Sequence, residues 1–169
     1  MVAHLIAVRS NRVVLPEGVR PASIHIAGGR IVRVLDHDET TGVREIVEFG
    51  DLVVSPIPLI GSTSHPLEFG ATLEQLLALK PAILIPGHGP VMRDDAYVRQ
   101  EIRLLASIRQ QVEAAVAHGS SLEDTRKSVD LEPMRRLFAG DSQLRSFIFT
   151  NYVVTPGVAA AYRDAIARR

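Results

Sequence analysis

A short apolar run that ends in a Gly-His-Gly turn constrains the fold of this chain more than any other sequence feature. The run, residues 82–85, reads Ala-Ile-Leu-Ile and predicts a strand buried on both faces. Pro86 ends the strand, and the glycines on both sides of His88 allow positive φ angles and the close approach of another group. A histidine on such a turn can ligate a metal or move a proton. The alternative is a tight strand-to-helix turn with an incidental histidine.

The composition excludes several classes of function. The 169 residues include 19 Lys+Arg and 19 Asp+Glu, and this zero net charge argues against a nucleic-acid-binding protein. Cysteine is absent, so any metal must be held by histidine, aspartate or glutamate. The start of the chain lacks the pattern of a signal peptide, and no stretch approaches the ~20 apolar residues of a membrane span. A soluble cytoplasmic protein is therefore expected.

Residues 1–55 contain short apolar runs separated by turn signals, a pattern typical of a small β-sandwich or meander. The strongest hairpin signal is the Gly28-Gly29 pair between strands predicted at 23–27 and 30–35. Ile24 and Ile26 should face one way, with Ile31 or Val32 opposite according to the register. Further strands are predicted at residues 4–8, 12–15, 45–49 and 51–54.

Three features of this β-rich segment involve histidine. In Asp36-His37-Asp38, two carboxylates flank an imidazole, which is compatible with a metal site. A solvated hairpin loop is the favoured interpretation, because acidic residues and glycine are ordinary loop chemistry. His4 and His25 lie within strand patterns and are expected to be surface or cross-strand residues rather than ligands.

From residue 66 the chain is predicted to be helical around the single strand at 82–85. The first helix covers residues 66–80, with Pro66 suited to its first turn. The longest covers residues 95–118, where Asp94 can cap the start and Gly119 can end it. Its predicted apolar face contains residues spaced by three or four: Val98, Ile102, Leu105, Ile108, Val112 and Ala115.

Three more helix starts follow, at a capping box in residues 121–124, at Asp141, and at Thr155-Pro156. The predicted fold class is therefore α+β, with a β-rich N-terminal segment joined to a mostly helical remainder. The junction is placed near residues 49–51.

The second part of the chain resembles the C-terminal half of a metallo-β-lactamase-fold hydrolase. The resemblance rests on residues 51–54, 64–69, 72–76 and 85–91. In order, they give an aspartate after a glycine, a helix, a buried strand and a histidine between glycines. The resemblance implies that Asp51 and His88 are metal ligands, and that the metal is a divalent cation such as zinc.

The first part resembles a different family. Residues 12–18, 24–32 and 50–56 are similar to the N-terminal β-segment of amidohydrolases such as dihydroorotases and allantoinases, in which that segment precedes a metal-binding barrel. The Gly-Asp-Leu-Val-Val stretch at 50–54 fits both families and is the natural junction. The chain is thus interpreted as a chimera of residues 1–50 and 51–169 that folds as one unit.

The metal site implied by these resemblances is incomplete. The His-x-His-x-Asp-His cluster of metallo-β-lactamase-fold enzymes is missing from the sequence, so only Asp51 and His88 carry over. A catalytic zinc normally has three protein ligands. His65 is the candidate third ligand, since two histidines and a carboxylate suit zinc; the alternative is that His65 merely begins a helix. Dimerisation is a second route, because half of the parent fold leaves a sheet face uncovered that a second copy can cover. A dimer could bring residues 36–38 near His88 of the other subunit.

Two hypotheses of function follow. The first is a metal-dependent hydrolase of small-molecule esters, lactones or phosphoesters, in which Asp51 and His88 bind the metal and Asp51 can also orient the attacking water. The second is a folded chimera without specific catalysis, in which the Asp/His pair is a relic. Neither a nucleic acid nor a membrane is expected as a partner.

Overall fold

The computed structural model describes residues 5–39, 41–43, 45–48, 51–81 and 83–168 of an α+β protein. The chain forms two compact units, unit 1 at Met1–Leu52 and unit 2 at Val53–Arg169. Strands make up unit 1 and helices unit 2, which confirms the predicted fold class. Among the described residues, none of the helices has the length and hydrophobicity needed to cross a membrane.

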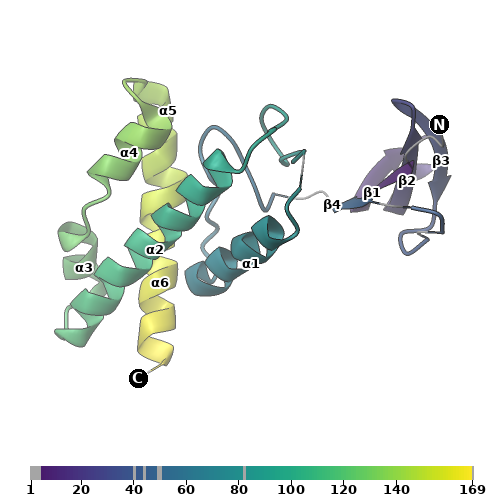
Figure 1. Ribbon diagram of the computed structural model, residues 1–169. Coiled ribbons are helices and arrows are strands. Elements are labelled where there is room, and N and C mark those ends of the chain that lie inside the picture. Colours follow the sequence, from purple (N-terminus) through teal and green to yellow (C-terminus); the bar gives the residue numbers. More distant parts are fainter. Residues whose placement is uncertain (1–4, 40, 44, 49–50, 82, 169) are drawn as a thin grey trace. The chain divides into compact units, whose positions relative to one another are not determined.

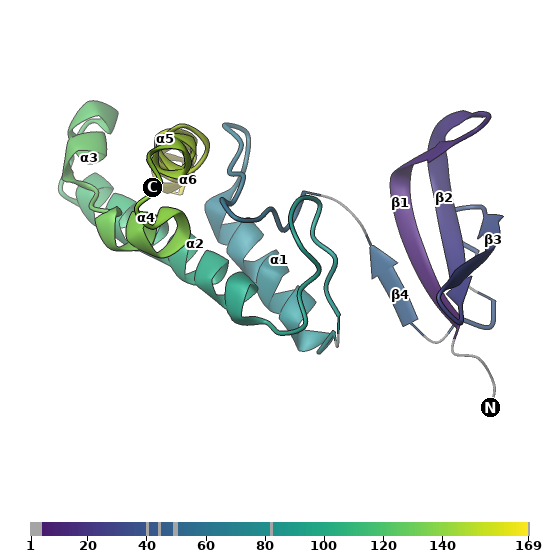
Figure 2. The same ribbon diagram turned by 90° about the horizontal axis from the view of Figure 1, so that it is seen from above.

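Unit 1 is a four-stranded sheet of β1 (Leu5–Leu15), β2 (Gly18–Ala27), β3 (Arg30–Leu35) and β4 (Glu45–Glu48). Its strand order is β3-β2-β1-β4, which can be followed in Figure 2. The first three strands form an antiparallel meander, whereas β4 pairs with β1 in parallel. The two strands predicted at 4–8 and 12–15 are the single strand β1, whose register shifts after Ser10.

The predicted Gly-Gly hairpin is confirmed. Gly28 and Gly29 have φ angles of 57° and 75°, the left-handed conformation that a two-residue type I′ turn requires at both positions. Ile26 pairs with Ile31, so the structure selects this partner over Val32. An irregularity between His25 and Ile26 then shifts the register of the remaining pairs.

The two described histidines of unit 1 make polar contacts with nearby residues of the same unit. His25 occupies a cross-strand position but is fully buried, with Nε2 at 3.1 Å from Ser23 Oγ and 3.0 Å from the carbonyl oxygen of Glu39. His37 pairs with Asp38 at 3.0 Å in an exposed turn, where the Asp38 side chain is 95% exposed. The solvated-loop interpretation of residues 36–38 is therefore confirmed. His4 lies outside the described residues.

Unit 2 contains six α-helices among its described residues. They are α1 (Pro66–Ala78), α2 (Ala96–Ala117), α3 (Leu122–Ser128), α4 (Glu132–Ala139), α5 (Gln143–Phe149) and α6 (Thr155–Ala167). Figure 1 shows α2 crossing α6 at an angle, and α2 packs against both α1 and α6. Edge-to-face contact between Tyr97 and Phe138, and stacking of Phe138 on Phe149, extend this core to α4 and α5.

The long helix is confirmed to within one residue at each end. Asp94 Oδ1 accepts a hydrogen bond from the Ala96 N–H at 3.0 Å, and Gly119 leaves the helix with φ 78°. Packing against α1 and α6 buries Glu101, Leu104 and Val116 outside the predicted face, whereas Ile102 and Ala115 of that face are only partly buried. The buried residues of α2 are Val98, Glu101, Leu104, Leu105, Ile108, Val112 and Val116.

The last helical region corrects the sequence prediction. Helix α5, a π-helical segment at Thr150–Val154 and α6 follow one another without a break, so Thr155-Pro156 does not begin a separate helix. Ser142, rather than Asp141, caps α5 by accepting a hydrogen bond from the Arg145 N–H at 3.3 Å.

A backbone contact explains how the helix continues through Pro156. Proline has no N–H, so it cannot bond the carbonyl of Tyr152 four residues earlier. The Ile60 N–H donates to that carbonyl instead, at 2.9 Å. The loop before α1 is thereby fixed to the helix at the point where the proline interrupts its ladder.

The predicted strand at 82–85 is the main error. Residues 83–85 form no regular strand, and Leu84 makes only an isolated antiparallel bridge with Met92. Leu84 is buried, but Ile83 is 40% exposed, so the segment is not covered on both faces. Residues 51–54 also form no strand; Val54 instead bridges His88. Prolines at 81 and 86 cannot donate hydrogen bonds, which limits any ladder between them. Ala82 lies outside the described residues.

Candidate metal site

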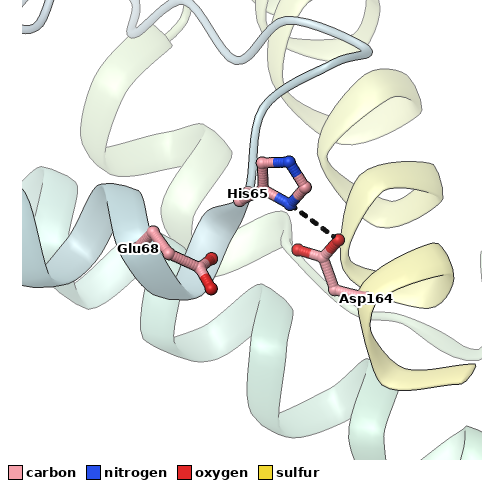
Figure 3. Close-up of side chains that lie close together, drawn as sticks. All are labelled: His65, Glu68 and Asp164. Carbon is pink, nitrogen blue, oxygen red and sulfur yellow. Dashed lines mark hydrogen bonds and ion pairs between the residues drawn. The ribbon is translucent and has the colours of Figure 1, made fainter. Parts of the chain in front are cut away.

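His65 stands at the N-cap position of α1 in an extended conformation, with φ −119° and ψ 95°. The following Pro66 favours this conformation, since it disfavours a helical residue before it. The imidazole makes no capping hydrogen bond and is available for other partners. Its Nδ1 lies 3.0 Å from Oδ1 of Asp164 on α6 (Figure 3).

Asp164 is the buried member of this pair. It is only 9% exposed and lies on the α6 face that buries Ala160, Ala161 and Ala165. Among the described residues, its Oδ2 has no hydrogen-bond partner. Figure 3 shows this second oxygen turned toward Glu68. An unpartnered buried carboxylate oxygen costs free energy, and a bound cation would remove that cost.

Glu68 completes the group from the first turn of α1, where it is exposed. One ligand atom from each of His65, Glu68 and Asp164 lies within 4.8 Å of the other two. Ligands that share a tetrahedral cation at about 2.1 Å lie roughly 3 to 4 Å apart, so small side-chain movements suffice. One imidazole and two carboxylates form a donor set suited to zinc or a similar divalent cation.

Within the part of the chain that the structure describes, one of the three predicted ligands is grouped with other metal-binding side chains. His65 is joined by Glu68 and Asp164, neither of which the sequence analysis selected. Asp51 belongs to unit 1, and His65 and His88 belong to unit 2, so the set of all three stays a prediction. Asp164 had one usable signal: it is a charged residue at core spacing in an otherwise apolar helix face.

His88 lies on an exposed turn that the backbone holds closely. Its carbonyl accepts from the Ser55 N–H at 3.0 Å, and the neighbouring Gly87 N–H donates to the Val53 carbonyl at 2.9 Å. The Tyr97 hydroxyl of α2 donates to the Val54 carbonyl at 2.6 Å. The turn that carries His88 is therefore attached to α2.

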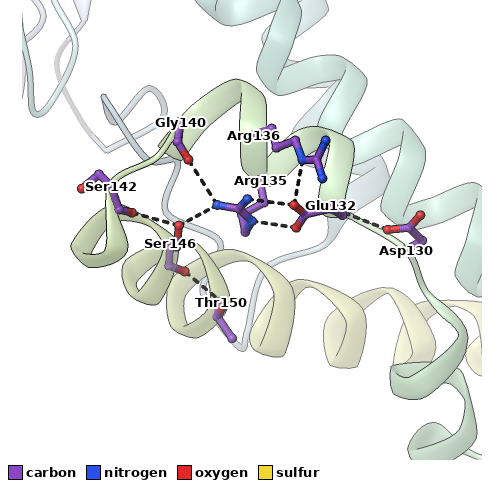
Figure 4. A network of polar contacts seen from close by, with 8 residues as sticks. All are labelled: Asp130, Glu132, Arg135, Arg136, Gly140, Ser142, Ser146 and Thr150. Carbon is purple, nitrogen blue, oxygen red and sulfur yellow. Dashed lines mark hydrogen bonds and ion pairs between the residues drawn. The ribbon is translucent and has the colours of Figure 1, made fainter.

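A second polar cluster joins α4 to α5 and is satisfied internally (Figure 4). Glu132 accepts hydrogen bonds from Arg135 and Arg136, and these bonds lower the pKa of Glu132 to about 2. Arg135 also donates to Ser146 Oγ at 2.7 Å and to the Gly140 carbonyl at 3.2 Å. Because these charged groups bind one another, the cluster is a structural clamp between helices.

A surface groove of about 580 Å³ runs between α1 and α2. Its lining includes the side chains of Leu77 and Ile102, with Glu74 and Arg103 among the charged residues. A smaller hollow of about 120 Å³ continues along α1 as far as Pro66, the residue after His65. His65, Glu68 and Asp164 do not line either space, so the groove and the metal site are separate features.

Comparison with known proteins finds a similarity over part of the chain. The chain matches none of the known protein-family profiles. Allantoinase from Streptomyces avermitilis is 42% identical over 68 residues, a match that covers 40% of this chain and 15% of that protein. Part of the chain is therefore amidohydrolase-like, as one of the two resemblances implied. The metallo-β-lactamase resemblance stays a prediction.

Proposed function

We propose that this chain is a metal-dependent hydrolase of small-molecule esters or phosphoesters, with a divalent cation, preferably zinc, between His65, Glu68 and Asp164. One observation carries the proposal: the buried Asp164 carboxylate has an unpartnered Oδ2 among the described residues and faces two other ligand side chains. The partial match to an allantoinase adds support for hydrolase ancestry.

Each residue has a distinct task in the proposed site. Bound there, a divalent cation supplies Lewis-acid chemistry, polarising a carbonyl or phosphoryl oxygen and lowering the pKa of water towards about 7. His65 and Asp164 would each give one ligand atom to the cation, and the 3.0 Å separation of Nδ1 and Oδ1 is close to that of two ligands of one ion. Glu68, on the exposed side, can complete the ligand set or accept a proton from the attacking water.

We expect the metal affinity to depend on both His65 and Asp164. Titration of Zn²⁺ into the full chain by calorimetry should show one site, weakened at least tenfold in His65→Ala and in Asp164→Asn. His37→Ala is the matched control, because His37 makes the same 3.0 Å contact to an aspartate that is exposed rather than buried. Hydrolysis of nitrophenyl acetate and nitrophenyl phosphate, with and without chelator, measures the activity.

The outcomes separate the proposals. Wild-type protein that binds no Zn²⁺, or equal affinities in all variants, would contradict the site at His65. Loss of binding in His88→Ala, with His65→Ala unchanged, would move the site to the Asp51/His88 pair that the metallo-β-lactamase resemblance implies. The second hypothesis from the sequence analysis is a folded chimera without specific catalysis. Binding without hydrolysis, or hydrolysis unaffected by chelation, would support that hypothesis.

The homodimer is also a proposal. The apolar side chains of Ile31, Val32 and Val34 on β3 are exposed by 64%, 49% and 37%, and pairing with a second copy would cover them. Light scattering at micromolar concentration should give twice the chain mass of 18.4 kDa. A species of the chain mass alone would contradict the dimer.

A further inference from the structure

Two consecutive residues of α6 contact the loop that leads into α1. Asp164 contacts the His65 ring, as described above, while Arg163 contacts the backbone immediately before it. Arg163 Nη1 donates to the Ser62 carbonyl at 2.8 Å, and its Nη2 donates to the Ser64 carbonyl at 2.6 Å. One side chain thus holds two carbonyls of the three residues that precede His65.

The geometry of this loop suits a guanidinium. Ser64 folds back on Gly61, with its N–H and its hydroxyl donating to the Gly61 carbonyl at 3.0 Å and 2.7 Å. The carbonyls of Ser62 and Ser64 are left to accept from elsewhere, and the planar fork of arginine presents two donors at once. Lysine carries the same charge but lacks this fixed fork.

We propose that Arg163 is a positioning residue of the metal site: its two hydrogen bonds hold the loop so that His65 stays over Asp164. This inference rests on the proposed function, since it concerns the same site. It assigns to Arg163 an indirect part in cation binding, through the backbone on which His65 stands. Among the described residues of the ligand group, the Arg163 side chain contacts one, with Nη2 3.4 Å from Asp164 Oδ1.

The charge of Arg163 has the opposite effect on a cation. A guanidinium this close to the ligand group repels a divalent cation, so loss of its charge alone would strengthen binding. Loss of the two backbone hydrogen bonds would weaken binding, because the His65 ring is no longer held. The sign of the change in affinity therefore reports which effect dominates.

The test is a Co²⁺ titration of the full chain, followed by the visible absorption of bound Co²⁺. Arg163→Lys keeps the charge and loses the fork, and Arg163→Gln loses both. We expect the Co²⁺ affinity to fall about tenfold in each, with changed absorption bands and a nearly unchanged unfolding midpoint of the metal-free protein. Arg103→Gln, which removes an exposed arginine from α2, should leave affinity and spectrum unchanged.

The possible failures are distinguishable. Unchanged or tighter binding in Arg163→Gln, or wild-type affinity in Arg163→Lys, would overturn the positioning role while leaving the metal site intact. A wild-type chain that binds no Co²⁺ would overturn the proposed function itself. An equal loss in Arg103→Gln would show that the loss does not depend on the loop contacts of Arg163, which also overturns the positioning role.

Discussion

Replacing Glu101 with glutamine should remove a large pH dependence from the stability of unit 2. Glu101 lies in the second turn of α2 and is fully buried. Among the described residues, neither of its carboxylate oxygens has a hydrogen-bond partner. Burial without a partner disfavours the charged form and raises the pKa of Glu101 to about 8. The side chain is therefore mostly neutral at pH 7.

The direction of the pH dependence follows from the pKa of Glu101 in the folded and in the unfolded chain. In the unfolded chain the glutamate loses its proton near pH 4.5, whereas in the folded chain it keeps the proton up to about pH 8. The folded state thus binds more protons between these values, so the free energy of unfolding falls as the pH rises. Below pH 4.5 the contribution is fully present, and above pH 8 it is lost. The loss between pH 5 and pH 8.5 amounts to about 4 kcal/mol.

Urea unfolding at several pH values, followed by circular dichroism at 222 nm, measures this loss through the helices of unit 2. The difference in unfolding free energy between wild type and Glu101→Gln should grow in favour of the variant as the pH rises. Glu113→Gln is the control on the same helix, because Glu113 is partly exposed and lies 3.5 Å from Arg109. Parallel pH profiles of wild type and Glu101→Gln would show that the carboxyl is not held neutral.

Alanine at Gly89 should destabilise unit 2 by about 2 to 6 kcal/mol. Gly89 has φ 105°, a conformation that costs a residue with a side chain about 1–3 kcal/mol. A Cβ atom there would also lie 2.8 Å from Ser55 Cβ and 2.9 Å from the Ser55 carbonyl oxygen. Relieving this overlap would separate the turn of His88 from Ser55, at a further cost of about 1–3 kcal/mol.

Gly119→Ala separates the two contributions. Gly119 also has a positive φ, 78°, but a Cβ added there meets no atom within 4 Å. Its replacement should cost only the backbone strain, roughly 1–2 kcal/mol. Equal losses for the two variants, measured by urea unfolding, would contradict a steric role for the contact between Gly89 and Ser55.

Local chemistry was sufficient to predict the parts of the fold that depend on neighbouring residues. The Gly28-Gly29 hairpin follows from a turn that needs two positive φ angles. The ends of α2 follow from Asp94 and Gly119, whose effects extend over only a few residues. The sequence could not predict that Pro156 lies inside a continuous helix, because the hydrogen bond that satisfies Tyr152 comes from Ile60.

For the candidate site, the sequence by itself determined that His65 begins a helix with an extended backbone, since Pro66 imposes that conformation locally. It also determined that any metal must rely on nitrogen and oxygen ligands, because cysteine is absent. Only the tertiary structure decided that Asp164, 99 residues further along, lies against His65. It also decided that Glu101 and Asp164 are buried while His88 is exposed. Burial and long-range contact depend on how α1, α2 and α6 pack, and the pattern of any single segment does not contain that information.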